Sequence, residues 1–299
     1  MHFGRNEIDI TNFDHHLPAD SVRTLRVFEN AEPVGDFEAF VGAPKWGYKN
    51  WIGSLYPKGT KDADFLRNYA RYFNTVELGA TFYQPQPRER IAAWKEMVQD
   101  IPDFKFCPKF PQSITHIRRF RNVEEQTNEF YTNISVFGKH LGPLFLQLAD
   151  NFSPKSFPEL RSYLSSLPSD APLYIEVRNK SWFAAEEHRN SLFNLLSDLN
   201  IGAVISDTAG RRDCLHMELT VPHAFIRFVN CGDERTDLLR LDEWVKRLKA
   251  WKQTGLRSLY FFIHAGDAPS LSLYDYFIDS LNRELSLKIQ IPGRRLNNL

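Results

Sequence analysis

The chain has 299 residues, of which 42% are hydrophobic and 25% charged, a balance typical of a globular protein with a large core. Lysine and arginine together number 37, as do aspartate and glutamate, so no net charge draws the whole molecule to DNA, RNA or anionic lipid. Any anion site must therefore be local, and nucleic acid is a possible partner but not a favoured one.

Cysteine usage and apolar run lengths indicate the compartment. Cys107, Cys214 and Cys231 are too few and too scattered for a disulfide framework or a zinc site, and their odd number favours a reducing environment. No apolar run is long enough to cross a membrane, and Glu7 and Asp9 interrupt any signal-like start. We expect a cytoplasmic protein with no membrane partner.

Residues 1–36 show no strong periodicity and contain Pro18, Pro33 and Gly35, with a weak helical pattern over Val22–Phe28. This segment is predicted to be an N-terminal extension that packs on the main domain. At the other end, residues 288–299 are predicted to form an irregular C-terminal tail.

Between these ends, short apolar runs alternate with longer stretches of helical periodicity, which is the pattern of repeated βα units. Helices are predicted at 62–73, 87–99, 123–140, 155–166, 185–199, 238–254 and 270–285. The predicted strands are Phe37–Val41, Thr75–Glu77, Phe104–Cys107, Leu144–Leu148, Leu173–Val177, Ile201–Ile205, Ala224–Phe228 and Leu259–Ile263.

Eight such units in series predict an α/β fold, a single-domain (β/α)₈ TIM barrel over residues 37–287. Residues 208–222 lack a full helical pattern, so the unit that contains them is expected to be degenerate. The long loop at 42–57, rich in Trp, Tyr and Gly, follows the first strand, and loops of that length are usually functional.

Several ordered motifs resemble the family called domain of unknown function 72, the YecE-like proteins, and the resemblance implies a TIM barrel over roughly residues 40–280. The last strand, which ends in Ile263-His264, departs from the amide-rich end expected for this family. The motifs are Trp46-Gly47-Tyr48, Thr75-Val76-Glu77-Leu78-Gly79, Lys105-Phe106-Cys107-Pro108-Lys109, Thr115-His116, Leu146-Gln147-Leu148, Glu176-Val177-Arg178, Ser206-Asp207-Thr208 and Arg227-Phe228.

A residue that can do chemistry ends or closely follows each predicted strand. In a barrel these positions share one mouth at the carboxyl ends of the strands, where the active sites of such folds lie. The residues are Trp46, Glu77, Lys109, Gln147, Glu176, Asp207, Arg227 and His264.

Glu77 and Glu176 are the candidate catalytic residues. A carboxyl that is partly desolvated at a barrel mouth can have a raised pKa and act as an acid or base. The alternative is that each glutamate is ion-paired, to Lys109 or Arg178, and only orders the site.

Cations recur at the strand ends and are expected to bind an anionic substrate, because several converging cations would make an anion pocket. They could instead neutralise nearby carboxylates. The candidates are Lys109, Arg178, Arg211 and Arg227, while Arg212 is expected to be structural.

Aromatic and histidine side chains complete the predicted mouth. Trp46 and Tyr83 are candidates for stacking on a ligand, although such rings could equally form an apolar lid. His116 and His264 could carry a proton near neutral pH. A metal site would need these histidines to converge with carboxylates such as Asp207, but no close ligand pair is present, so neither a metal nor a cofactor is predicted.

Phosphate-binding glycine motifs and the Gly-x-Ser-x-Gly motif are absent, which argues against Rossmann, P-loop and α/β-hydrolase enzymes. The leading prediction is a metal-independent enzyme for a small phosphorylated or carboxylated, sugar-like substrate. A metal-dependent phosphodiesterase, nuclease or isomerase, and a non-catalytic ligand-binding or regulatory module, remain alternatives.

Overall fold

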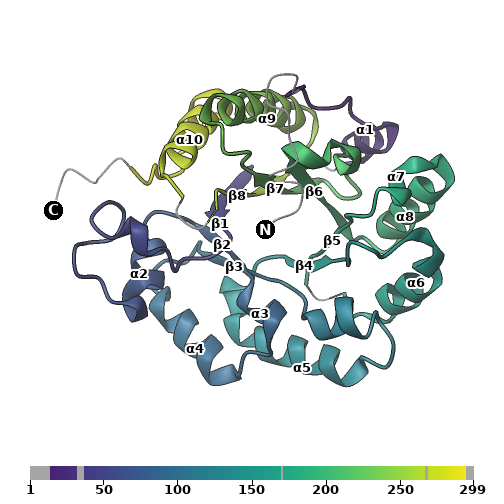
Figure 1. The fold of residues 1–299 in the computed structure, drawn as a ribbon, viewed down its shortest axis with the longest axis horizontal. Coiled ribbons are helices and arrows are strands. Elements are labelled where there is room, and N and C mark those ends of the chain that lie inside the picture. Colours follow the sequence, from purple (N-terminus) through teal and green to yellow (C-terminus); the bar gives the residue numbers. More distant parts are fainter. Residues whose placement is uncertain (1–13, 32–36, 170, 267–268, 294–299) are drawn as a thin grey trace.

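The computed structural model describes residues 14–31, 37–169, 171–266 and 269–293. Eight parallel strands form a central ring and helices surround it (Figure 1), which confirms the predicted (β/α)₈ barrel. The strands are β1 (Glu38–Ala43), β2 (Thr75–Leu78), β3 (Lys105–Pro108), β4 (Leu144–Gln147), β5 (Leu173–Glu176), β6 (Gly202–Thr208), β7 (His223–Val229) and β8 (Ser258–His264).

The ring follows chain order, with β8 paired in parallel beside β1. Its seam lies between β3 and β4, where isolated bridges pair Phe106 with Leu141 and Lys109 with Phe145. The N–H of Phe110 also donates to the carbonyl of Phe145 at 2.9 Å. Lys109 therefore leaves β3 at the point where the barrel is held together most sparsely.

The predicted helices form in the expected places, as their apolar periodicity requires. Short turns in the loops after β2, β3 and β5 were not predicted: α3 (Ala80–Tyr83), the π-helical turn η4 (Ser113–Ile117) and α7 (Ser181–Ala184). The longer helices are α2 (Phe65–Tyr69), α4 (Arg88–Met97), α5 (Glu124–Ile134), α6 (Phe157–Ser166), α8 (Glu186–Asp198), α9 (Glu234–Thr254) and α10 (Ser272–Leu285). None of the helices in the described ranges has the length and apolar character needed to span a membrane.

The unit between β6 and β7 is degenerate, as predicted: it holds only the 3₁₀ helix η7 (Ala209–Cys214), and residues 215–222 are not helical. Helix α1 (Val22–Glu29), from before β1, lies in the helical ring beside α9 (Figure 1). The hydroxyl of Thr24 donates to the carbonyl of Met217 at 2.6 Å and accepts from the N–H of Leu219 at 2.7 Å. The first helix therefore covers the flank that the degenerate unit leaves without a helix.

A separate apolar cluster fills the inside of the barrel, distinct from the larger core between strands and helices. Every second residue of a strand faces inward, so each strand except β2 contributes one or two side chains to this cluster, and Val221 joins it from the segment before β7. Its members are Phe40, Cys107, Phe145, Tyr174, Val204, Val221, Phe225, Tyr260 and Phe262.

Candidate functional site

A layer of polar side chains lies on top of the apolar cluster at the carboxyl ends of the strands. On β3 to β8, each polar residue stands two positions beyond an inward-facing member of the cluster, so both point into the barrel. We call this the polar layer: Glu77, Lys109, Gln147, Glu176, Ser206, Arg227 and His264.

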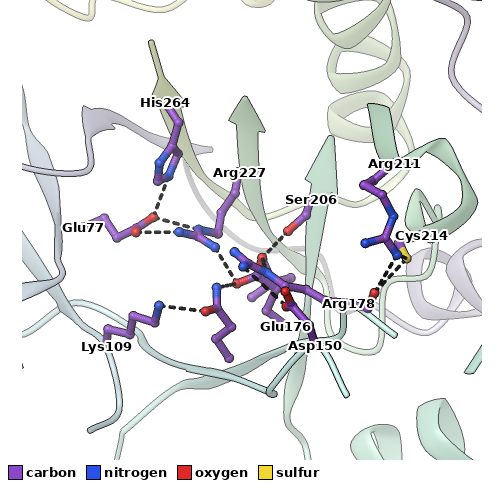
Figure 2. A network of polar contacts seen from close by, with 12 residues as sticks. Glu77, Lys109, Asp150, Glu176, Arg178, Ser206, Arg211, Cys214, Arg227 and His264 are labelled. Carbon is purple, nitrogen blue, oxygen red and sulfur yellow. Dashed lines mark hydrogen bonds and ion pairs between the residues drawn. The ribbon is translucent and has the colours of Figure 1, made fainter. Parts of the chain in front are cut away.

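Arg227, on β7, is the centre of the polar layer (Figure 2). Its Nε and Nη2 donate to the two carboxylate oxygens of Glu77 at 2.8 and 2.7 Å, and its Nη1 donates to Oε2 of Glu176 at 2.5 Å. The guanidinium is 2% exposed, so these charge-assisted bonds are made away from solvent. One arginine therefore holds two carboxylates on opposite sides of the barrel mouth.

The carboxylate of Glu176 accepts hydrogen bonds from four side chains. Oε1 accepts from Nε of Arg178 at 3.0 Å and from the hydroxyl of Ser206 at 2.7 Å. Oε2 accepts from Nε2 of Gln147 at 2.6 Å and from Arg227. The side chain is fully buried, so its charge is compensated entirely by these neighbours.

The expectation of a raised carboxyl pKa is wrong for both glutamates. Burial alone would raise the pKa of Glu176, but the charges of Arg178 and Arg227 outweigh it and hold the pKa well below its usual range. Burial would likewise raise the pKa of Glu77, but the charge of Arg227 and the hydrogen bonds of His264 and Arg227 outweigh it and lower the pKa. Both carboxylates are thus ionised across the neutral range.

Unlike Arg227, the other cation of the polar layer, Lys109, has no carboxylate partner among the described residues. Its Nζ donates to Oε1 of Gln147 at 2.9 Å and lies 3.8 Å from the centre of the Phe82 ring. Within the part of the chain that the structure describes, it forms no ion pair. Burial, together with the charge of Arg227, lowers the pKa of Lys109 to about 7, so half of the molecules carry a neutral amine near pH 7.

The loop after β2 fixes the position of this amine. The hydroxyl of Thr81, on α3, lies within hydrogen-bond distance of the carbonyls of Leu78 and Lys109, at 2.8 and 2.7 Å, and accepts from the N–H of Lys109 at 3.1 Å. This ties α3 to the ends of β2 and β3 and brings the neighbouring Phe82 ring against the lysine.

The loop after β3 carries His116 on the π-helical turn η4. The imidazole lies edge-on to Phe82, with ring centres 5.1 Å apart, and burial with the nearby charge of Lys109 lowers its pKa to about 4. Downstream, Arg119, Phe120 and Asn122 have φ values of 50°, 69° and 52°, a region that residues other than glycine rarely occupy. Single π turns and such backbone strain gather at functional sites.

Arg178 and Arg211 lie at the edge of the layer, in the loops after β5 and β6. Nη1 of Arg178 is 3.8 Å from the exposed carboxylate of Asp150. Nη2 of Arg211 and Sγ of Cys214 both donate to the backbone carbonyl of Arg178, at 2.9 and 3.1 Å (Figure 2). Arg211 therefore contributes by holding the backbone that presents Arg178.

The family model described as "Protein of unknown function DUF72" matches residues 40–294. The chain belongs to this family. It is 31% identical over 253 residues to the UPF0759 protein YecE of Escherichia coli K12, an alignment that covers 78% of this chain and 89% of that protein.

Two solved DUF72 structures share the fold. The protein from Thermotoga maritima MSB8 has a TM-score of 0.61 at 20% identity, covering 82% of this chain and 99% of that one. The protein from Enterococcus faecalis V583 has a TM-score of 0.62 at 16% identity, covering 85% and 99%.

Six predicted site residues of this DUF72 chain are not members of the polar layer: Arg178, Arg211 and His116 lie in the loops described above, and Asp207, Trp46 and Tyr83 are placed as follows. Asp207 follows Ser206 on β6 and so points outward, where it forms buried bonds to Arg240 and Trp244 of α9, each at 2.8 Å. Trp46 packs edge-on against Trp94 and Phe106 in the helical layer. Tyr83 lies beside Phe82 but is 73% exposed.

Sequence reasoning missed Ser206 as part of the DUF72 site. The run Ile201–Ile205 is apolar on both faces, as in buried parallel strands, so it does not reveal which neighbour faces inward. Val204 belongs to the inner apolar cluster, and Ser206 stands two residues beyond it. This spacing is the signal that could have shown that Ser206, and not Asp207, faces into the barrel.

Proposed function

We propose that the polar layer is the active site of a metal-independent enzyme that binds a small anion and uses Lys109 as its acid–base group. The observation that carries the proposal is the buried amine of Lys109, which is bonded to an amide oxygen and not to a carboxylate. The substrate anion would be a carboxylate or phosphate.

The charges of the buried groups favour an anionic ligand. Lys109, Arg178 and Arg227 face two carboxylates, those of Glu77 and Glu176, and each of these side chains is less than one-tenth exposed. When Lys109 is protonated, one positive charge is left over. A bound monoanion would balance it, and in a desolvated site that balance contributes strongly to affinity.

The acid–base role moves from the glutamates to Lys109. Glu77 and Glu176 keep their charge at neutral pH and have low proton affinity, so they are poor general acids and weak general bases. A pKa of about 7 lets Lys109 both give and take a proton under physiological conditions. The glutamates instead hold Arg227 and Arg178 in place.

The metal-dependent alternative has less support from the site's geometry. Both oxygens of Glu77 and of Glu176 already accept hydrogen bonds from arginine, histidine, serine or glutamine, so metal ligation would have to break a buried network. No group of three or more His, Cys, Asp and Glu that could hold a metal ion was found among the described residues.

The proposal predicts that anion binding depends on the charge of Lys109. The pKa of Lys109 in the folded protein is about 7, so the side chain is cationic at pH 6 and neutral at pH 9. Lactate and sulfate do not titrate in this range. We expect at least about tenfold weaker binding of each at pH 9, since losing one nearby buried charge costs more than ~1.4 kcal/mol. Titration calorimetry measures both affinities.

Variants of Lys109 and of Lys105, the first residue of β3, provide the control. K109M should bind weakly at both pH values, whereas K109R should bind equally at both, because arginine stays charged. K105M removes an exposed amine at the start of β3 that donates to the carbonyl of Lys139, and it should behave as the wild type. A pH dependence that persists in K109R, or no binding of either anion by the wild type, contradicts the proposal.

A further inference from the structure

We propose that Lys109 is a covalent catalyst, forming an imine with a carbonyl carbon of the substrate, so that the substrate is a small oxo acid. This inference rests on the proposed function, because the carboxylate of the oxo acid would be the anion that the polar layer binds. It adds a carbonyl next to that carboxylate and a covalent intermediate.

The surroundings of Nζ are those of a nucleophile. An amine attacks a carbonyl only when it is neutral, and burial beside other cations is the usual way to keep a lysine neutral. Lys109 is 9% exposed, and its Nζ lies against the Phe82 ring. Its hydrogen-bond acceptor is the neutral amide oxygen of Gln147, which stabilises an ammonium ion less than a carboxylate would. Its backbone is clamped by Thr81, which limits the positions that the amine can take.

A short chain of hydrogen bonds connects the amine to a cation that can hold the carboxylate. Nζ of Lys109 donates to Gln147, Gln147 donates to Glu176, and Arg178 donates to the same carboxylate from the other side. Arg178 stands at the edge of the layer and is 8% exposed, with its Nη1 3.8 Å from the exposed carboxylate of Asp150. The guanidinium of Arg178 would bind the carboxylate of the substrate while Lys109 attacks its carbonyl.

His116 supplies a neutral hydrogen-bonding group against the Phe82 ring. Its imidazole is half-buried and neutral, and Nδ1 lies 2.7 Å from the hydroxyl of Thr115. A neutral imidazole donates a hydrogen bond with one ring nitrogen and accepts one with the other, so it can orient a bound polar ligand. The strained loop that follows it gives this residue a fixed place at the mouth.

The step balances without any further reactant. The lone pair of Nζ attacks the carbonyl carbon, the C=O π electrons move to oxygen, and the oxygen takes a proton to give a carbinolamine. The nitrogen then loses a proton, the hydroxyl is protonated and leaves as water, and a C=N bond forms. With the nitrogen protonated, the product is an iminium ion, and its positive charge replaces that of the lysine beside Glu176.

Borohydride trapping tests the imine directly. The wild-type protein is incubated with pyruvate, or with acetoacetate, whose carbonyl is one carbon further from the carboxylate, and then reduced with sodium borohydride. Peptide mass mapping should find the reduced adduct on Lys109 at least about tenfold above any other lysine, including Lys105. Labelling should rise between pH 6 and pH 8, as the amine of Lys109 becomes neutral, whereas ordinary exposed lysines need a pH near 10.

Lactate separates this inference from the proposed function, because it carries the carboxylate but no carbonyl. Lactate should slow the labelling of Lys109 by pyruvate, and K109R should bind lactate while giving no adduct. Lactate binding without any selective adduct from either oxo acid overturns the imine and leaves the anion site intact. Failure of lactate to bind, together with labelling no greater than at Lys105, overturns both.

Discussion

Four hydrogen-bond donors meet the carboxylate of Glu176, and this convergence determines what a substitution there must do. In Glu176→Gln, one oxygen is replaced by an NH₂ group that faces donors, and two buried arginines lose a counter-charge. Removing one partner of a buried ion pair costs several kcal/mol, so we expect a loss of unfolding free energy of about 3 kcal/mol. Urea unfolding measures it.

Asp150→Asn is the matched control in the same network. Asp150 is exposed and lies 3.8 Å from Arg178, and exposed pairs of this kind contribute less than about 1 kcal/mol. If Glu176→Gln were no more destabilising than Asp150→Asn, the view that Glu176 orders the arginines would be wrong. If Glu176→Gln instead lost turnover without losing stability, Glu176 would act directly in the reaction, as the sequence predicts.

At the residue scale, prediction from sequence succeeded where two residues of one strand were compared with each other, because residues two apart point the same way. Glu176 and Arg178 are two apart, and they do lie on the same side and contact each other. The prediction failed for Asp207. Because β6 is buried on both faces, its sequence does not show which alternate residues point into the barrel. The predicted direction of the Glu77 pKa shift was also wrong. That shift depends on Arg227, which is 150 positions from Glu77 in the chain.

At the element scale, helix α10 ends in a conformation that its sequence does not favour. Ser286 follows the helix with φ 56° and ψ 47°, the left-handed region usually taken by glycine at this position. Ser286→Gly should stabilise the protein by about 0.5 kcal/mol, because the relief of strain exceeds the added freedom of the unfolded chain. Thermal and urea unfolding both report this gain.

The same change inside a helix should have the opposite sign. Ser162 is an exposed residue within α6, and Ser162→Gly should destabilise by about 0.5 kcal/mol, the difference in helix propensity. Destabilisation by both changes would show that Ser286 is not strained.

The strands and long helices were predictable because their periodicity is local, whereas the π turn η4 and the short α3 and α7 depend on contacts that no short segment encodes.

At the scale of the whole molecule, one buried hydroxyl helps to attach α1 to the barrel. Thr24 is fully buried and satisfies both the carbonyl of Met217 and the N–H of Leu219. Thr24→Val keeps the shape but leaves two buried backbone groups without a partner, which should lower the unfolding free energy by about 2 to 4 kcal/mol. Thr24→Ser keeps the hydroxyl and should lose only about 1 kcal/mol for the missing methyl group. Equal losses in the two variants would refute this reading.

The attachment of α1 also constrains the order in which the chain can fold. Thr24 and Met217 are 193 positions apart, so this helix leaves the ribosome long before the segment it covers has been made. Contacts so distant in sequence form late, because a long loop must close first. During synthesis α1 therefore remains undocked while the early βα units assemble, and the flank beside β6 and β7 stays open to other chains until the two segments meet. Crowded nascent chains are expected to exchange this helix, which would link two barrels through swapped N-terminal segments.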